Sequence, residues 1–123
     1  MPARPRPADP AAVVAALERV RAAARTQTEP ARDDLRLLVK HYLALLVERA
    51  PGRAVEIRVP PFSAVQAVPG GTHTRGTPPA VVETDALTWI ALASGARTWA
   101  DAVRTGDIQS SGQRSDLSSY LPM

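Results

Sequence analysis

The spacing of apolar residues along the first third of the chain follows the helical period. A helix is expected from Asp9-Pro10, where a capping side chain precedes a proline in the first turn, to about residue 25. A second helix is expected between Pro30 and about Arg49, where a proline–glycine pair follows. Its wide apolar face predicts that it is mostly buried. The inward positions of the first helix are Val13, Leu17, Val20 and Ala24.

Between residues 53 and 84 the apolar period shortens to that of a strand. The segment RAVEIRV (53–59) alternates apolar and charged residues, which is typical of a half-buried strand. FSAVQAV (62–68) and AVVET (80–84) are predicted to be two further strands, because proline or glycine pairs bound them. THTRG (72–76) is a candidate short edge strand.

The C-terminal third contains short elements with clear start and stop signals. Thr84 or Asp85 caps a helix over 85–94, and Gly95 is its expected left-handed stop. Thr98 caps a second short helix, DIQSSG (107–112) is the last strand, and SDLSSYL (115–121) makes a final helical turn. The order predicts an α+β fold: a mostly antiparallel sheet of four or five strands covered by helices, with an N-terminal helical pair.

Composition sets the domain organisation. With 123 residues, 45% of them hydrophobic, the chain has room for one core. Residues 1–8 are predicted to be a disordered tail and 9–123 a single domain, with the helical pair at 9–50 and the sheet and covering helices at 53–122. The absence of cysteine excludes disulfides and thiol catalysis. Without a signal-peptide pattern or an apolar run long enough for a transmembrane segment, a cytoplasmic location is expected.

The net charge of +3 and the isoelectric point of about 10.2 raise the question of nucleic acid. Residues 1–53 carry ten basic and six acidic groups, whereas residues 54–123 carry five and six. Arg32, Arg36 and Lys40 fall on one helix face, but a stripe of three basic residues is more often a solvated face than a phosphate track. None of the five aromatic residues is interleaved with it to stack on bases. We therefore predict no specific nucleic-acid partner, and weak binding through this stripe stays as an alternative.

No set of polar residues forms a catalytic or metal-binding pattern. His41 is interpreted as a boundary residue of the second helix. His73 lies among Thr72, Thr74 and Arg75 and could serve as an acid or base, but an exposed turn is the simpler interpretation. The serines of QSSGQ lack the G-x-S-x-G context of a nucleophile. We predict that the chain is not an enzyme and has no catalytic residue, metal or cofactor.

The apolar side chains of the two short helices are more informative. Trp89 and Leu92 lie on one stripe of the helix 85–94, and Trp99 and Val103 add a second apolar wall. For each residue alone, filling the core is the simpler interpretation. Together, two capped helices that carry both tryptophans against a sheet are also a typical wall for an apolar small-molecule pocket.

Residues 83–122 carry a pattern that resembles a known family. The pattern begins with Glu83 and Thr84, which lead into a helix that contains the pair TW. The short helix of GARTWADA follows, and then the strand of GDIQSSG with an aspartate–leucine turn after it. With VEIRVPPFSAVQAV and HTRGTPP upstream, it resembles the sterol carrier protein-2-like family, in its bacterial branch found in actinobacteria. It is also similar to the C-terminal domain of mycothiol-dependent maleylpyruvate isomerases. The resemblance covers about residues 53–122, with the helix at 30–49 in place of the family's long first helix.

This resemblance implies both a fold and a function. In the family, two short helices cover a sheet and enclose a tunnel for fatty acyl chains, sterols or similar lipids. The leading hypothesis is therefore the non-enzymatic binding of an apolar ligand, with lipid carriage as its extension, in a pocket lined by Val65, Trp89, Leu92, Trp99 and Val103. The alternative is an accessory or interaction module that supports a separate enzyme, a protein partner, without a ligand of its own.

Overall fold

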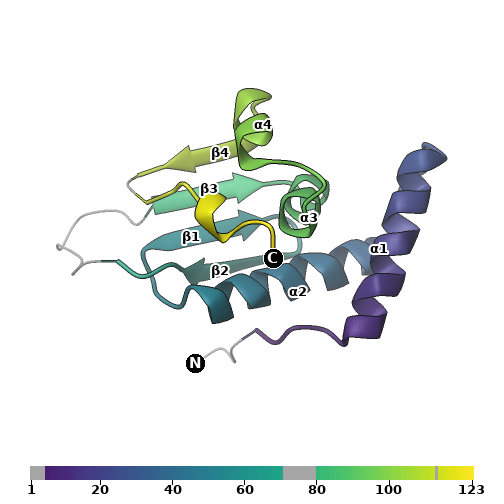
Figure 1. The fold of residues 1–123 in the computed structure, drawn as a ribbon, viewed down its shortest axis with the longest axis horizontal. Coiled ribbons are helices and arrows are strands. Elements are labelled where there is room, and N and C mark those ends of the chain that lie inside the picture. Colours follow the sequence, from purple (N-terminus) through teal and green to yellow (C-terminus); the bar gives the residue numbers. More distant parts are fainter. Residues whose placement is uncertain (1–4, 71–79, 113) are drawn as a thin grey trace.

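The computed structural model describes residues 5–70, 80–112 and 114–123 (Figure 1). Its helices and strands are α1 (Pro10–Arg25), α2 (Arg32–Arg49), β1 (Val55–Val59), β2 (Ser63–Ala67), β3 (Ala80–Thr84), α3 (Ala86–Ser94), α4 (Trp99–Arg104) and β4 (Ile108–Ser111), followed by a 3₁₀ turn, Ser118–Tyr120. This order confirms the predicted α+β class and the N-terminal helical pair. The candidate edge strand THTRG lies outside the described residues.

The four strands form one sheet in the order β2-β1-β3-β4. The pairs β1–β2 and β3–β4 are antiparallel, and the central pair β1–β3 is parallel. The sheet is therefore mostly antiparallel, as predicted. The parallel pair arises because β3 enters the sheet beside β1 rather than beside its predecessor β2.

The register of the strands separates an apolar face of the sheet from a polar one. Ile57 in β1 pairs with Val65 in β2 and Val82 in β3, so these three side chains share a face. Thr84 pairs with Ile108 at the end of the same face. The opposite face carries Glu56, Arg58, Gln66, Glu83 and Gln109. The alternation of apolar and polar residues along the strands thus gives the sheet one apolar face, which packs on the core.

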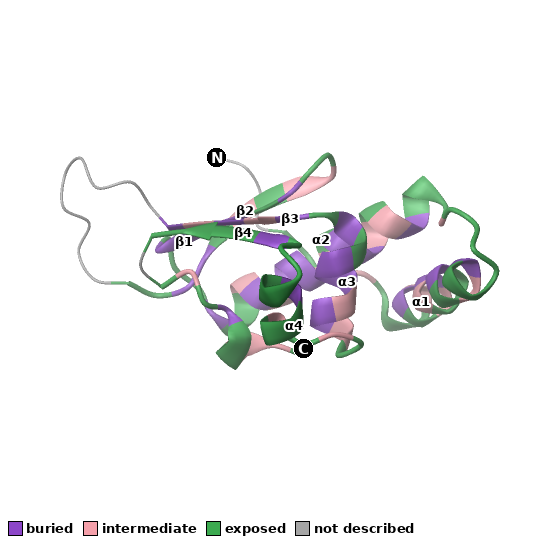
Figure 2. Cartoon of the chain, turned by 90° about the horizontal axis from the view of Figure 1, so that it is seen from above, coloured by how far each residue is buried: buried purple, intermediate pink, exposed green. Residues whose placement is uncertain are grey.

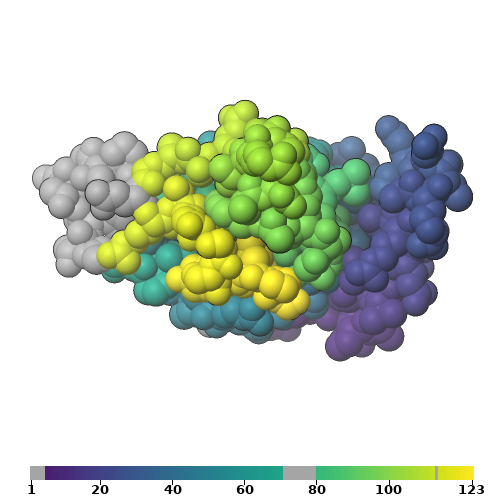
Figure 3. All heavy atoms as spheres, turned by 45° about the horizontal axis from the view of Figure 1, so that its top comes forward, coloured from purple at the N-terminus to yellow at the C-terminus, as the bar shows by residue number. Residues whose placement is uncertain are grey.

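Helices α2, α3 and α4 lie on the apolar side of the sheet, and together they make the second layer (Figure 2). The largest buried side chains of this layer are Leu38, Leu43, Leu46, Trp89 and Leu92, all less than 2% exposed. The C-terminal residues lie across the helical layer between α2 and α3 (Figure 3). The Arg49 guanidinium donates to the carbonyls of Tyr120 and Pro122, and the Met123 N–H donates to that of Ala93. These bonds hold the chain end on the core.

Helix α1 packs against α2 at one end of the molecule (Figure 1). Its buried residues are Val13, Ala16, Val20 and Ala23. Ala24 was predicted to face inward but is exposed. The buried residues lie three, seven and ten positions after Val13, so Ala23 and not Ala24 continues the buried stripe. Ala8, in the segment predicted to be a disordered tail, contacts α2: its N–H donates to His41 Nδ1 at 3.0 Å.

An ion pair joins α1 to α2. The Arg19 guanidinium makes two bonds to the Asp34 carboxylate, at 2.8 and 2.9 Å. Asp34 is a buried acidic residue in the first turn of α2, and the hydrogen bond from Arg19 lowers the pKa of its carboxyl. Arg19 is not among the buried residues of α1, and its partner lies on another helix, so the helical pattern of α1 alone does not reveal this bond.

Candidate functional site

The five predicted pocket residues come from both layers of the fold. Trp89 and Leu92 lie on α3 and are 0% and 1% exposed. Val65 lies on the core face of β2 and is half-buried against the same core. These three side chains therefore meet one apolar interior between the sheet and the helices.

Helix α4 carries the other two predicted residues, and they differ in burial. Trp99 is partly buried and packs against the core. Val103 follows it by one turn and is 48% exposed, so it faces solvent more than the core. The structure thus brings four of the five residues to the core and leaves Val103 at its outer edge.

Local signals fix the position of α3. Asp85 caps the helix: its carboxylate accepts from the Thr88 N–H at 3.2 Å and from the Thr88 hydroxyl at 2.6 Å. Gly95 ends it with a φ of 88°, a left-handed conformation that favours glycine. These caps orient the helix so that Trp89 and Leu92 point into the interior.

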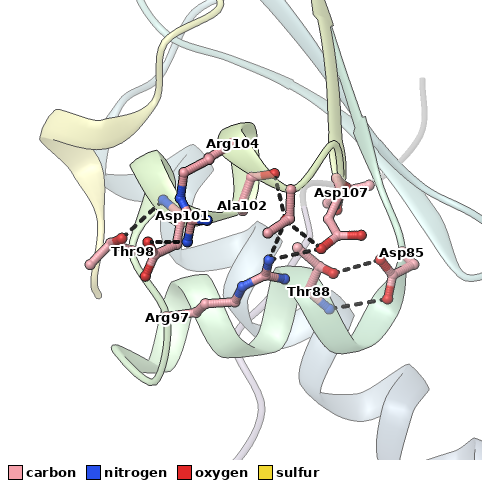
Figure 4. A network of polar contacts seen from close by, with 10 residues as sticks. Asp85, Thr88, Arg97, Thr98, Asp101, Ala102, Arg104 and Asp107 are labelled. Carbon is pink, nitrogen blue, oxygen red and sulfur yellow. Dashed lines mark hydrogen bonds and ion pairs between the residues drawn. The ribbon is translucent and has the colours of Figure 1, made fainter.

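A polar network holds α4 against the sheet (Figure 4). Arg97 donates to Thr105 and Asp107, and the Asp107 carboxylate also accepts from the Thr105 hydroxyl at 2.7 Å. The hydrogen bonds from Thr105 and then Arg97 lower the pKa of Asp107. The Asp107 carbonyl in turn accepts from Thr84 at the end of β3, at 2.7 Å. Each acid and base of this network has a structural partner, so the network positions α4 rather than offering a reactive group.

Helix α4 begins with its own cap. The Thr98 hydroxyl accepts from the Asp101 N–H at 3.1 Å. The Asp101 carboxylate pairs with Arg104 at 3.1 Å, and the hydrogen bond from Arg104 lowers the pKa of Asp101. These side chains are exposed, so they stabilise the ends of the helix and add no buried area to the core.

The remaining titratable groups give no sign of a reaction centre in the described chain. Burial lowers the pKa of His41, whose Nδ1 accepts from Ala8 and whose ring contacts Tyr42 edge-on at 5.0 Å. It therefore acts as the boundary residue that the sequence predicted. His73 and Arg75 lie outside the described residues. Among residues 5–70, 80–112 and 114–123, no three histidine, aspartate or glutamate side chains gather closely enough to hold a metal ion.

Two of the three residues of the basic stripe have partners within the chain. The Arg32 guanidinium lies 5.3 Å from the centre of the Phe62 ring, and Arg36 pairs with Asp33 at 3.2 Å. Lys40 is exposed. Across the described part of the chain, no helix has the length and apolar character needed to cross a membrane.

The sequence analysis missed one polar atom of the interior. Trp89 Nε1 is buried and has no hydrogen-bond partner among the described residues. The buried side chains of Asp34, Thr84 and Thr88 all have hydrogen-bond partners. The available signal was a tryptophan in a helix whose other polar side chains, Thr88 and Ser94, bond to Asp85 and to the Ala91 carbonyl.

Comparison with known proteins supplies the family. Residues 31–123 match the model of a family described as bacterial SCP ortholog, where SCP denotes sterol carrier protein. No curated protein matches the chain. The match begins just before α2 and includes the described sheet, α3 and α4, whereas α1 lies outside it. Because it covers well over half of the chain and agrees with the resemblance of residues 83–122, the chain belongs to a bacterial sterol carrier protein-like family.

Proposed function

We propose that this protein binds an apolar ligand, such as a sterol, a fatty acid or another acyl chain, between its sheet and its helical layer, and that it does so without catalysing a reaction. The single observation that carries the proposal is the match of residues 31–123 to a sterol carrier protein family. Carriage of the ligand would extend this binding function.

The fold supports the proposal through the arrangement of its apolar surfaces. Val65, Trp89 and Leu92 reach one interior from two layers, and Trp99 of α4 packs against the same core. Side chains without charge supply contact area and exclude water, which is what an apolar ligand requires. On this proposal Val65, Trp89, Leu92 and Trp99 contact the ligand, and Val103 lies at the outer end of the site.

Ligand titration tests the proposal directly, because both tryptophans belong to the proposed site. Palmitate, palmitoyl-CoA and cholesterol are added separately while tryptophan emission and the melting temperature are recorded. A ligand that binds only the folded state at one hundred times its Kd raises the free energy of unfolding by about 2.7 kcal/mol. We expect at least one probe to shift both signals, and the proposal fails if none of the three does.

A matched pair of variants on β2 locates the binding site. Val65→Thr puts a hydroxyl on the core face of the strand, whereas Ala64→Ser puts one on the exposed face. Burying a hydroxyl against an apolar ligand without a partner weakens binding. We expect Val65→Thr to weaken the binding of the probe several-fold and Ala64→Ser to leave it unchanged. Equal affinities for both variants would place the ligand elsewhere.

The second candidate is an accessory or interaction module that supports a separate enzyme. The observation in its favour is the exposed apolar side chain of Val103, 48% accessible on α4. The segment THTRGTPP (72–79) lies outside the described residues. The same titration separates the two candidates, since a module without its own ligand shows no change in melting temperature with any probe.

A further inference from the structure

The indole N–H of Trp89 is a polar group in an otherwise apolar part of the interior. Trp89 is 0% exposed, and no described residue accepts a hydrogen bond from its Nε1. A buried donor left unpaired carries most of its desolvation cost, so folded proteins seldom retain one. Trp89 Nε1 is the only such side-chain atom in the described chain.

None of the described side chains accepts a hydrogen bond from this donor, and the nearby buried polar groups bond elsewhere. The Thr88 hydroxyl, one residue away, donates to Asp85, and the Thr84 hydroxyl donates to the Asp107 carbonyl. The Asp34 carboxylate is occupied by both bonds from Arg19. The buried side chains of Thr84, Thr88 and Asp34 thus bond to other groups, and none of them accepts from Trp89 Nε1.

The surroundings also restrict the charge of any acceptor. Apart from Asp34, Thr84, Thr88 and the hydroxyl-bearing Tyr42, the buried side chains of the described chain are mainly apolar, and none of them is basic. A carboxylate placed there would lose its hydration without gaining a cation, which costs far more than one hydrogen bond returns. A neutral oxygen, such as a hydroxyl or a carbonyl, carries no such penalty.

We propose that Trp89 selects ligands by donating its indole N–H to a neutral oxygen buried with an otherwise apolar ligand. The inference rests on the proposed function and adds a preference to it. The protein favours neutral oxygenated lipids, such as alcohols, ketones and esters, over pure hydrocarbons. A free fatty acid enters with its hydrocarbon end and leaves its carboxylate outside, so it does not engage the indole.

Three probes with the same alkyl chain test this preference: dodecane, dodecanol and dodecanoate, each delivered from cyclodextrin. The two indole N–H groups give two cross-peaks in a ¹H–¹⁵N spectrum, and Trp99→Phe assigns them without altering Trp89. We expect dodecanol to move the Trp89 proton cross-peak downfield, whereas dodecane and dodecanoate do not. The preference for dodecanol over dodecane should be about 3- to 10-fold larger in the wild type than in Trp89→Phe, which keeps an aromatic side chain and removes the donor.

Each other outcome has a definite meaning. If dodecane and dodecanol bind, but the Trp89 cross-peak responds equally to both and Trp89→Phe retains the preference, the inference is wrong and the proposed function stands. The inference is also wrong if dodecanoate moves the cross-peak as dodecanol does. It is wrong, too, if the Trp89 N–H still shows cross-relaxation to an internal water when dodecanol saturates the protein, because the donor is then bonded to water and not to the ligand. If none of the three C12 probes binds, the inference fails, and the titration with palmitate, palmitoyl-CoA and cholesterol decides separately whether the proposed function stands. The spectra of the wild type decide the question even where Trp89→Phe does not fold.

Discussion

Helices α3 and α4 make an instructive pair, because each is short, each is capped by a side chain and each carries one tryptophan. Trp89 of α3 is fully buried, whereas Trp99 of α4 is only partly buried. Helix α3 packs against α2 within the core, and α4 is held at the edge by the network around Arg97 and Asp107. Local signals can therefore specify two helices equally well while tertiary packing gives them different roles.

The difference indicates how the two helices divide structure and binding. Helix α3 supplies buried area to the core, and in doing so it buries a donor that has no partner among the described residues. Helix α4 supplies exposed polar bonds and an apolar surface that solvent or a partner can reach. The stability of the domain should therefore depend much more on α3 than on α4.

The largest expected effect is that of Trp89→Ala. Truncating a fully buried tryptophan removes its transfer free energy and leaves a cavity, so the free energy of unfolding should fall by about 3–5 kcal/mol. That is a large part of the roughly 5–15 kcal/mol expected for a domain. Chemical unfolding followed by circular dichroism measures it, with Trp89→Phe as the conservative control. A loss below about 2 kcal/mol would show that α3 is not the buried helix of the pair.

Trp99→Ala should have a smaller effect on stability and a clearer effect on binding. Because part of the ring is already in contact with solvent, the lost area corresponds to about 1–2 kcal/mol. The truncation should also weaken or reshape the binding of the probe that the wild type binds. Chemical unfolding with and without that probe gives both quantities. A loss as large as that of Trp89→Ala, with an unchanged ligand response, would contradict a place for Trp99 in the site.

The fold was largely predictable because its signals are local. Asp85 and Gly95 bound α3 as expected, Thr98 caps α4, and AVVET forms β3 over the predicted residues. Each of these signals acts within a few residues of the backbone group that it satisfies. Such bonds depend on residues that are close in sequence, so the sequence alone can anticipate where they form.

The candidate site was less predictable because it depends on distant partners. The parallel pairing of β1 with β3 and the bond between Arg19 and Asp34 join segments that no local pattern connects. Trp89 Nε1 has no partner in the described part of the chain, which no local pattern reveals, and Val103 was expected in the apolar wall but is half exposed. Apolar periodicity finds the inward face of a helix, but it does not measure how deeply the helix is embedded.

The two helix caps should differ in the same direction as the tryptophans. Asp85→Ala removes two bonds and leaves the buried Thr88 hydroxyl without its acceptor, so we expect a loss of about 1–2 kcal/mol. Thr98→Ala removes one bond at an exposed position and should cost about 0.5–1 kcal/mol. Both are measured by chemical unfolding under the same conditions. The reverse order would mean that α4 is the more tightly integrated helix.

The smallest expected effect comes from a pair of half-exposed apolar residues, one on each helix. Val103 on α4 is 48% exposed and Leu87 on α3 is 47% exposed. Valine and serine have similar helix propensities, so Val103→Ser should change the free energy of unfolding by no more than about 0.5 kcal/mol. Leu87→Ser should cost slightly more, because leucine is the better helix former.

Equal exposure makes these two variants a test of function rather than of stability. If Val103 lies at the outer end of the ligand site, Val103→Ser weakens the binding of the probe while the melting temperature of the unliganded protein stays constant. Leu87→Ser, which lies outside the proposed site, then leaves binding unchanged. The measurement is the probe-induced rise in melting temperature for both variants and the wild type. If the probe raises the melting temperature of both variants equally, the ligand site ends at Trp99. The exposed apolar surface of α4 is then better explained as a contact surface for a protein partner.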